Sequence, residues 1–166
     1  MNNSFKILGA MALAFMIASP TLVLAGSGHN TVNKSIRIDD NADVGNLNSV
    51  NGSVKIGQDA MVESVDTVNG AINIAEGVAV DESIESVNGA ISIAAGGEIG
   101  GDVETVNGGI RVINTRVAGD VETVNGQIRL LDSSEVTGSV VVRKPNGWSF
   151  NKRRKPVRVE IGENVI

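Results

Sequence analysis

Ser86-Val-Asn-Gly-Ala-Ile-Ser-Ile93 is the stretch that decides the fold, because its pattern returns along most of the 166-residue chain. Val-Asn-Gly occurs at 50–52, 68–70, 87–89, 106–108 and 124–126, and Val32-Asn33-Lys34 is a degenerate sixth copy. Successive copies start 18, 18, 19, 19 and 18 residues apart. A repeat of this regularity indicates an architecture of stacked, similar units.

Each copy of the repeat carries two short strand signals. Val-Asn-Gly is followed by an alternation of aliphatic and other residues, as in Ala90-Ile-Ser-Ile93. A second apolar pair closes the copy, as in Val80/Ile84. Alternating β-branched residues bounded by Asn and Gly predict β-strands, and no stretch after residue 25 has helical periodicity.

Two all-β architectures fit this pattern. In the first, Asn-Gly forms a hairpin turn, which would place Glu104 opposite Arg111 on the neighbouring strand. In the second, each copy is one coil of a β-solenoid, and Asn-Gly turns a corner. The constant period, the lack of Pro between Pro20 and Pro145 and the lack of aromatic residues in the repeats favour the solenoid. We therefore predict a single parallel β-helix of six or more coils, with about 18–19 residues and three short strands per coil.

The chain divides into five segments. Residues 1–25 combine the basic Lys6, a short apolar run and the small residue Ala25, which predicts a cleaved secretory signal peptide. An uncleaved membrane anchor is disfavoured because the run is short and interrupted. A short N-terminal extension (26–30), the β-solenoid repeats (31–142), a basic loop insertion (143–155) and a terminal strand segment (156–166) follow. We expect an exported protein, in the periplasm, on the cell surface or secreted, with no transmembrane anchor after cleavage.

Stacked coils turn each repeat position into a column of side chains about 4.8 Å apart. We expect the asparagine amides, from Asn33 onwards, to bond along the stack as a ladder, and each corner glycine to adopt a positive φ. A Ser/Thr column beside the ladder is expected to satisfy turn backbone groups. The structural corner residues are Asn51, Gly52, Asn69, Gly70, Asn88, Gly89, Asn107, Gly108, Asn125 and Gly126. The Ser/Thr column is Thr31, Ser49, Thr67, Ser86, Thr105 and Thr123.

The repeats resemble a known family. The V-N-G-x-[IV]-x-[IV] repeats behind a signal peptide, with Val117-Ala-Gly-Asp-Val121 and Val136-Thr-Gly-Ser-Val140, are similar to exported bacterial proteins of the adhesin-like β-helix family, which includes autotransporter adhesin-head domains of unknown function. More distantly, they are similar to the bactofilins, which are polymer-forming β-helix proteins. The resemblance covers residues 31–166 and implies a right-handed parallel β-helix in the bacterial envelope. It implies no catalytic residue.

One column of the repeats is acidic and comprises Asp66, Glu85, Glu104 and Glu122. Stacked carboxylates could bind cations or act as paired acids on a sugar, so a polysaccharide-acting enzyme is an alternative function. A solvated face relieved by Arg111 and Arg129 is the favoured interpretation, because the repeats lack the long loops that wall a catalytic groove.

The segment 143–155 breaks the repeat with a concentrated positive charge and two aromatic residues. By contrast, residues 26–142 carry 6 basic and 17 acidic side chains. The segment is either a loop folded onto its own acidic body or a binding site for an envelope polyanion or glycan. The candidate binding residues are Arg143, Lys144, Trp148, Phe150, Lys152, Arg153, Arg154 and Lys155.

Composition excludes several function classes. There is no Cys, which removes disulfides, thiolate metal sites and cysteine nucleophiles, and the single His29 lies in a polar stretch. A net charge of −5 and an acidic body argue against nucleic-acid binding. We expect a non-enzymatic structural or adhesin-like interaction module of the cell envelope, with no metal and no cofactor. A scaffold that self-associates end to end is a further alternative, because terminal coils leave strand edges unpaired.

Overall fold

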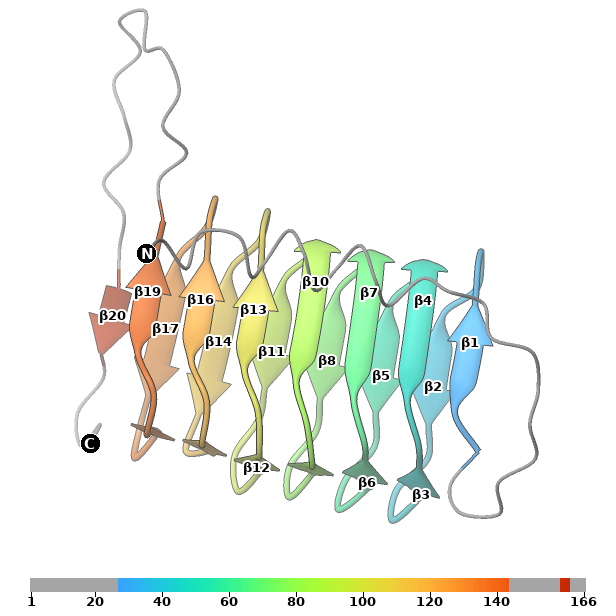
Figure 1. Cartoon of the computed structure of the whole chain (residues 1–166). Helices are drawn as coiled ribbons and strands as arrows, with labels where there is room; N and C mark the ends of the chain where they lie inside the picture. Colours follow the sequence, from blue (N-terminus) through green and yellow to red (C-terminus); the bar gives the residue numbers. More distant parts are fainter. Residues whose placement is uncertain (1–26, 144–158, 162–166) are drawn as a thin grey trace, which may run out of the picture.

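The chain folds as an all-β parallel solenoid of six coils, followed by two strands of a further coil, as the repeats predict. The structure, a computed structural model, describes residues 27–143 and the backbone of 159–161. Each complete coil contributes one strand to each of three sheets, which we call sheets A, B and C (Figure 1). In that view sheet A faces the reader, sheet B lies behind it, and the short strands of sheet C follow the lower edge.

Sheet A contains the strand that leads into each Val-Asn-Gly corner. Its strands are β1 (His29–Thr31), β4 (Leu47–Asn51), β7 (Val65–Asn69), β10 (Ile84–Asn88), β13 (Val103–Thr105), β16 (Val121–Thr123) and β19 (Val140–Val142).

Sheet B contains the strand that leaves each corner. Its strands are β2 (Ile36–Ile38), β5 (Val54–Ile56), β8 (Ile72–Ile74), β11 (Ile91–Ile93), β14 (Ile110–Ile113), β17 (Ile128–Leu131) and β20 (Val159–Ile161). The two-residue strands of sheet C are β3 (Asp43–Val44), β6 (Met61–Val62), β9 (Ala79–Val80), β12 (Glu98–Ile99), β15 (Arg116–Val117) and β18 (Glu135–Val136).

The strand register reproduces the sequence repeat. Every pairing between described strands is parallel, and Asn51, for example, lies opposite Asn69 of the next coil. This arrangement rules out the hairpin alternative. Glu104 faces Glu85 and Glu122 across the strands, not Arg111.

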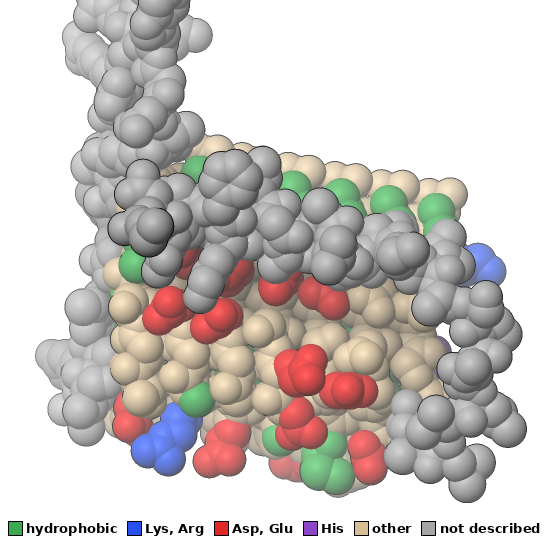
Figure 2. Space-filling view, viewed as in Figure 1, with side chains coloured by type: hydrophobic (Ala, Val, Ile, Leu, Met, Phe, Trp, Pro, Cys, Tyr) green, Lys and Arg blue, Asp and Glu red, His purple; other side chains and the backbone are tan. Residues whose placement is uncertain are grey.

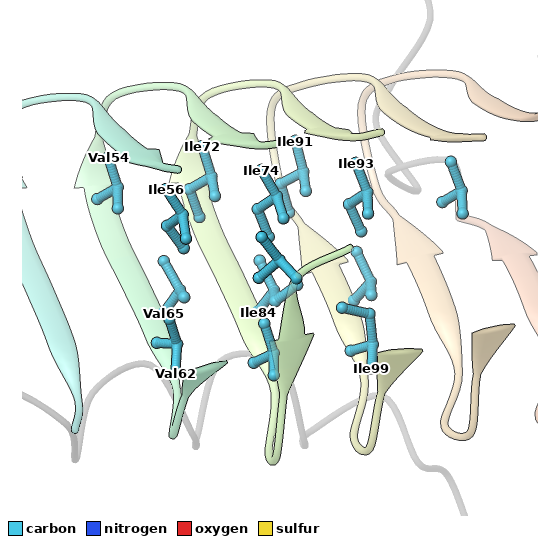
Figure 3. Packing of buried hydrophobic residues seen from close by; sticks show 14 of the residues in the cluster. Val54, Ile56, Val62, Val65, Ile72, Ile74, Ile84, Ile91, Ile93 and Ile99 are labelled. Carbon is cyan, nitrogen blue, oxygen red and sulfur yellow. The ribbon is translucent and has the colours of Figure 1, made fainter. Parts of the chain in front are cut away.

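A narrow apolar core fills the solenoid. Along the strands, buried side chains alternate with outward ones, as in Ile91–Ile93. Equivalent residues of successive coils, such as Val54, Ile72 and Ile91, follow one another through the interior (Figure 3). Each fully buried Val or Ile contributes about 1.5–3 kcal/mol to folding, which explains how coils of 18 or 19 residues hold together without an aromatic core.

The corner between sheets A and B holds the asparagine ladder that the sequence predicts. Nδ2 of Asn88 donates to Oδ1 of Asn69 at 2.9 Å, and the equivalent bond joins every successive pair from Asn33 to Asn125 at 2.8–3.0 Å. Each amide therefore ties its coil to the one before, so the predicted structural role of the ladder is confirmed.

The prediction that the corner glycines adopt a positive φ is wrong. Among the described glycines, only Gly77 and Gly96 have a positive φ, and both lie in the turn between sheets B and C. The corner glycines are needed for space instead. A Cβ on Gly108 would overlap the carbonyl oxygen of Gly89 in the preceding coil, and the other Val-Asn-Gly corners repeat this close approach.

Candidate functional site

The outward positions of the sheets carry the residues available for function. In sheet B the middle residue of each Ile-x-Ile strand points away from the core, and in sheet A the second residue of each strand does so. Because the strands are in register, these positions form columns along the solenoid. The corner residues, by contrast, are engaged in holding the coils together.

The acidic column lies on the outward face of sheet A, where Figure 2 shows carboxylate side chains gathered. The register places Asp66 opposite Glu85, Glu85 opposite Glu104, and Glu104 opposite Glu122. Like charges directly opposite one another are destabilising, so this face favours protonation.

Burial and neighbouring carboxylates shift the acidity of this column. Partial burial, followed by the charges of Glu85 and Glu82, raises the pKa of Asp66 to about 6. Burial, followed by the charge of Glu85 and then Glu122, raises the pKa of Glu104 to about 7. The pKa of Glu85 is raised in the same direction, mainly by burial. Asp66 and Glu104 are thus proton-binding groups near neutral pH.

Arg143 lies at the end of the acidic column. Its Nη2 donates to Oε2 of Glu122 at 3.0 Å, and its Nε contacts Oε1 of the same carboxylate. The hydrogen bond to Glu122 raises the pKa of the guanidinium. This first residue of the basic segment is therefore bound to the acidic body of its own chain.

The other predicted binding residues of the basic segment lie outside the described residues; they are Lys144, Trp148, Phe150, Lys152, Arg153, Arg154 and Lys155. The predicted signal peptide, 1–25, lies outside them as well. The expectation that Arg111 and Arg129 neighbour the acidic column is wrong, because both stand on sheet B. Arg143 takes that place.

A second column, which sequence reasoning missed, runs along the outward face of sheet B. The register pairs Arg37 with Lys55, and Arg111 with Arg129, one coil apart. The column is Arg37, Lys55, Asn73, Ser92, Arg111 and Arg129, and Glu160 of β20 follows Arg129 in register. The signal was present in the sequence as the central residue of each [IV]-x-[IVL] stretch, which carries a positive charge in four of six copies.

A groove of about 930 Å³ follows the first four residues of this sheet B column. Its walls include Arg37, Lys55, Asn73 and Ser92, together with Asp39 and Asp40. The position after each strand is small in the second and third coils, where Gly57 and Ala75 also line the groove. In the fifth and sixth coils the same position holds Ile113 and Leu131, so the recess belongs to the N-terminal half of the solenoid.

Neither a metal cluster nor a membrane-spanning helix is found in the part of the chain that the structure describes. No group of three or more His, Cys, Asp or Glu side chains within residues 27–143 is placed to hold a metal ion. No helix in this part is long and apolar enough to cross a membrane.

Comparison with protein-family models, with characterised proteins and with solved structures gives no significant match for this chain. The fold by itself defines the class of this protein, which is a parallel β-solenoid.

Proposed function

We propose that this protein is a non-enzymatic, exported β-solenoid that serves as a structural or surface-interaction module, adhesin-like, of the bacterial cell envelope. One observation carries the proposal. Inward and corner positions repeat the same residue types from coil to coil, whereas the outward positions of sheet B change from Arg37 through Asn73 to Arg111. A regular scaffold whose outward residues differ from coil to coil suits the recognition of extended partners.

The predicted signal peptide at 1–25 supports export, and the resemblance of the repeats to adhesin-like β-helices supports an envelope location. The stacked carboxylates of sheet A favour a binding or structural role over catalysis. Glycoside hydrolysis requires one carboxyl group to hold a proton while a second remains ionised. Here the pKa values of Asp66, Glu85 and Glu104 are all raised, mainly by burial, so these three carboxylates are not separated into a proton donor and an ionised partner.

Cosedimentation with isolated bacterial envelopes tests this function. We expect the purified protein to bind envelopes saturably, and heat-unfolded protein to lose that saturable binding. The same incubation, assayed for newly formed reducing ends, addresses the enzymatic alternative. Failure to bind envelopes would refute the interaction role, and release of sugar ends would replace it with a polysaccharide-acting enzyme.

A further inference from the structure

We propose that the groove on sheet B binds a linear polysaccharide bearing carboxylate groups, with Arg37 and Lys55 holding its acid groups. The inference rests on the proposed surface-interaction function and names the class of ligand. Arg37 and Lys55 are both exposed, lie one coil apart in register, and line the same groove.

Arg37 and Lys55 place two positive charges side by side on adjacent strands. Like charges opposite one another on adjacent parallel strands repel. Within the described residues, neither Arg37 nor Lys55 forms an ion pair with a carboxylate. An anionic ligand would relieve the repulsion and would gain charge-assisted hydrogen bonds from both side chains.

The remaining groove residues favour a sugar over a simple polyanion. Asn73 and Ser92 continue the column and offer an amide and a hydroxyl, which can both donate and accept hydrogen bonds. Asp40 accepts the backbone N–H of Gln58 through Oδ1 at 2.8 Å, and Oδ2 can accept a hydroxyl. The carboxylates of Asp39 and Asp40 repel the anionic groups of any ligand, whereas the hydroxyls of a glycan can donate hydrogen bonds to them.

The geometry of the solenoid favours an extended ligand. Outward side chains of sheet B recur about every 4.8 Å along the stack, so a polymer lying along this axis meets one side chain per coil. Gly57 and Ala75 keep the wall of the groove low beside Lys55 and Asn73. Arg111 continues the column beyond Ser92 and extends the path.

Calorimetric titration of the purified protein with polygalacturonate tests the inference. We expect binding that weakens as salt is added, because exposed charges are screened. The variant Arg37→Gln with Lys55→Gln should raise Kd about tenfold, because each exposed ion pair is modest but two are lost. The matched control, Lys34→Gln with Arg116→Gln, removes the same charge outside the groove and should leave Kd nearly unchanged.

Three results would overturn the inference. Equal losses in both variants would mean that binding follows net charge, and polyphosphate binding as tightly as polygalacturonate would mean that no sugar is recognised. Absence of polygalacturonate binding in a protein that still binds envelopes would refute the groove assignment and leave the proposed function standing; absence of both would refute both.

Hydrogen exchange on the unaltered protein keeps the test independent of the variants' folding. Added polygalacturonate should slow exchange in β2 and β5, and protection confined to other strands would contradict the inference.

Discussion

The hydroxyl of Thr105 donates a hydrogen bond of 2.9 Å to the carbonyl oxygen of Gly89, the corner glycine of the preceding coil. Thr123 makes the same bond to Gly108 at 2.9 Å. Both threonines are buried, and a buried carbonyl without a partner is costly. The polar Ser/Thr column inside the solenoid thus has a structural reason, and it acts at the corners between sheets A and B.

The bond between Thr105 and Gly89 predicts the effect of removing one hydroxyl. Thr105→Val keeps the side-chain shape but removes the donor, so the free energy of unfolding should fall by about 1–3 kcal/mol. Thr105→Ser keeps the donor and should cost less. Urea denaturation of the two variants measures the difference; a Val variant as stable as the Ser variant would contradict this role.

Two adjacent glycines predict opposite responses to a single methyl group. A Cβ on Gly108 would overlap the backbone of Gly89, whereas a Cβ on Gly109 meets its nearest neighbour, the carbonyl oxygen of Gln127, at 3.4 Å. We expect Gly108→Ala to destabilise the fold by about 1–3 kcal/mol through overpacking. Gly109→Ala should change the free energy of unfolding by less than about 0.5 kcal/mol. Equal midpoints of thermal unfolding would contradict the close approach.

The sequence was sufficient to predict the period, the strands and the buried positions, because each depends on a local pattern repeated six times. It was also sufficient for the ladder from Asn33 to Asn125, since stacking identical coils brings identical amides together. The role of Gly108 was not predictable in the same way. Either a positive φ or the close approach of another backbone segment requires glycine. Only the packing of one coil against the next shows which of the two reasons applies at Gly108.

The candidate surfaces were predicted less completely. The acidic column was visible as a repeat position, and the basic segment was recognised as a possible partner of the acidic body, but the particular contact between Arg143 and Glu122 was not predictable because Arg143 lies outside the repeated pattern. The cations Arg37 and Lys55 stand 18 residues apart in the sequence, and the next two copies of the repeat carry uncharged residues at the same position. Their significance depends on the groove, whose shape follows from small residues in neighbouring coils.

A different corner supplies the positive φ that the Val-Asn-Gly corner lacks. In the turn between sheets B and C this position is held by Asn41, Asp59, Gly77, Gly96, Asn114 and Asp132. Gly96 has φ of +79°, and a Cβ there would meet only ordinary contacts, the nearest at 3.7 Å.

Substitutions at Gly96 therefore test the effect of the backbone conformation without overlap with neighbouring atoms. Gly96→Val should lower the free energy of unfolding by about 1–2 kcal/mol, because a β-branched residue is strained in the left-handed region. Gly96→Asn should cost less, since Asn tolerates this conformation and occupies the equivalent place in other coils. Denaturant midpoints that rank Asn below Val would contradict the expected order.

The predicted signal peptide specifies where the exported chain begins. Cleavage after Ala25 would leave Gly26 as the first residue, so N-terminal peptide mass spectrometry of the protein from its native host should find Gly26 at the start of the chain. A full-length species beginning at Met1 as the main form would contradict export by this route.

The acidic column of sheet A predicts a dependence of stability on pH. Burial, followed by the charges of the facing Glu85 and Glu122 and of the nearby Asp102 and Asp120, raises the pKa of Glu104 from 4.5 to about 7. Across that interval the folded chain retains a proton that the unfolded chain releases. The free energy of unfolding should therefore fall as pH rises from about 4.5 to about 7, and level off above it.

Glu104→Gln should remove much of this slope, because the amide has no proton to lose and relieves the repulsion on its neighbours. Glu98→Gln is the matched control, since Glu98 is exposed on β12 of sheet C, away from the column. Urea midpoints between about pH 5 and about pH 8 measure both variants beside the unaltered protein. The Glu98 variant should keep the original slope. Two results would contradict this prediction: a free energy of unfolding that rises with pH in the unaltered protein, or a Glu104 variant with an undiminished slope. Either result would show that Glu104 does not retain a proton in the folded chain across this pH range.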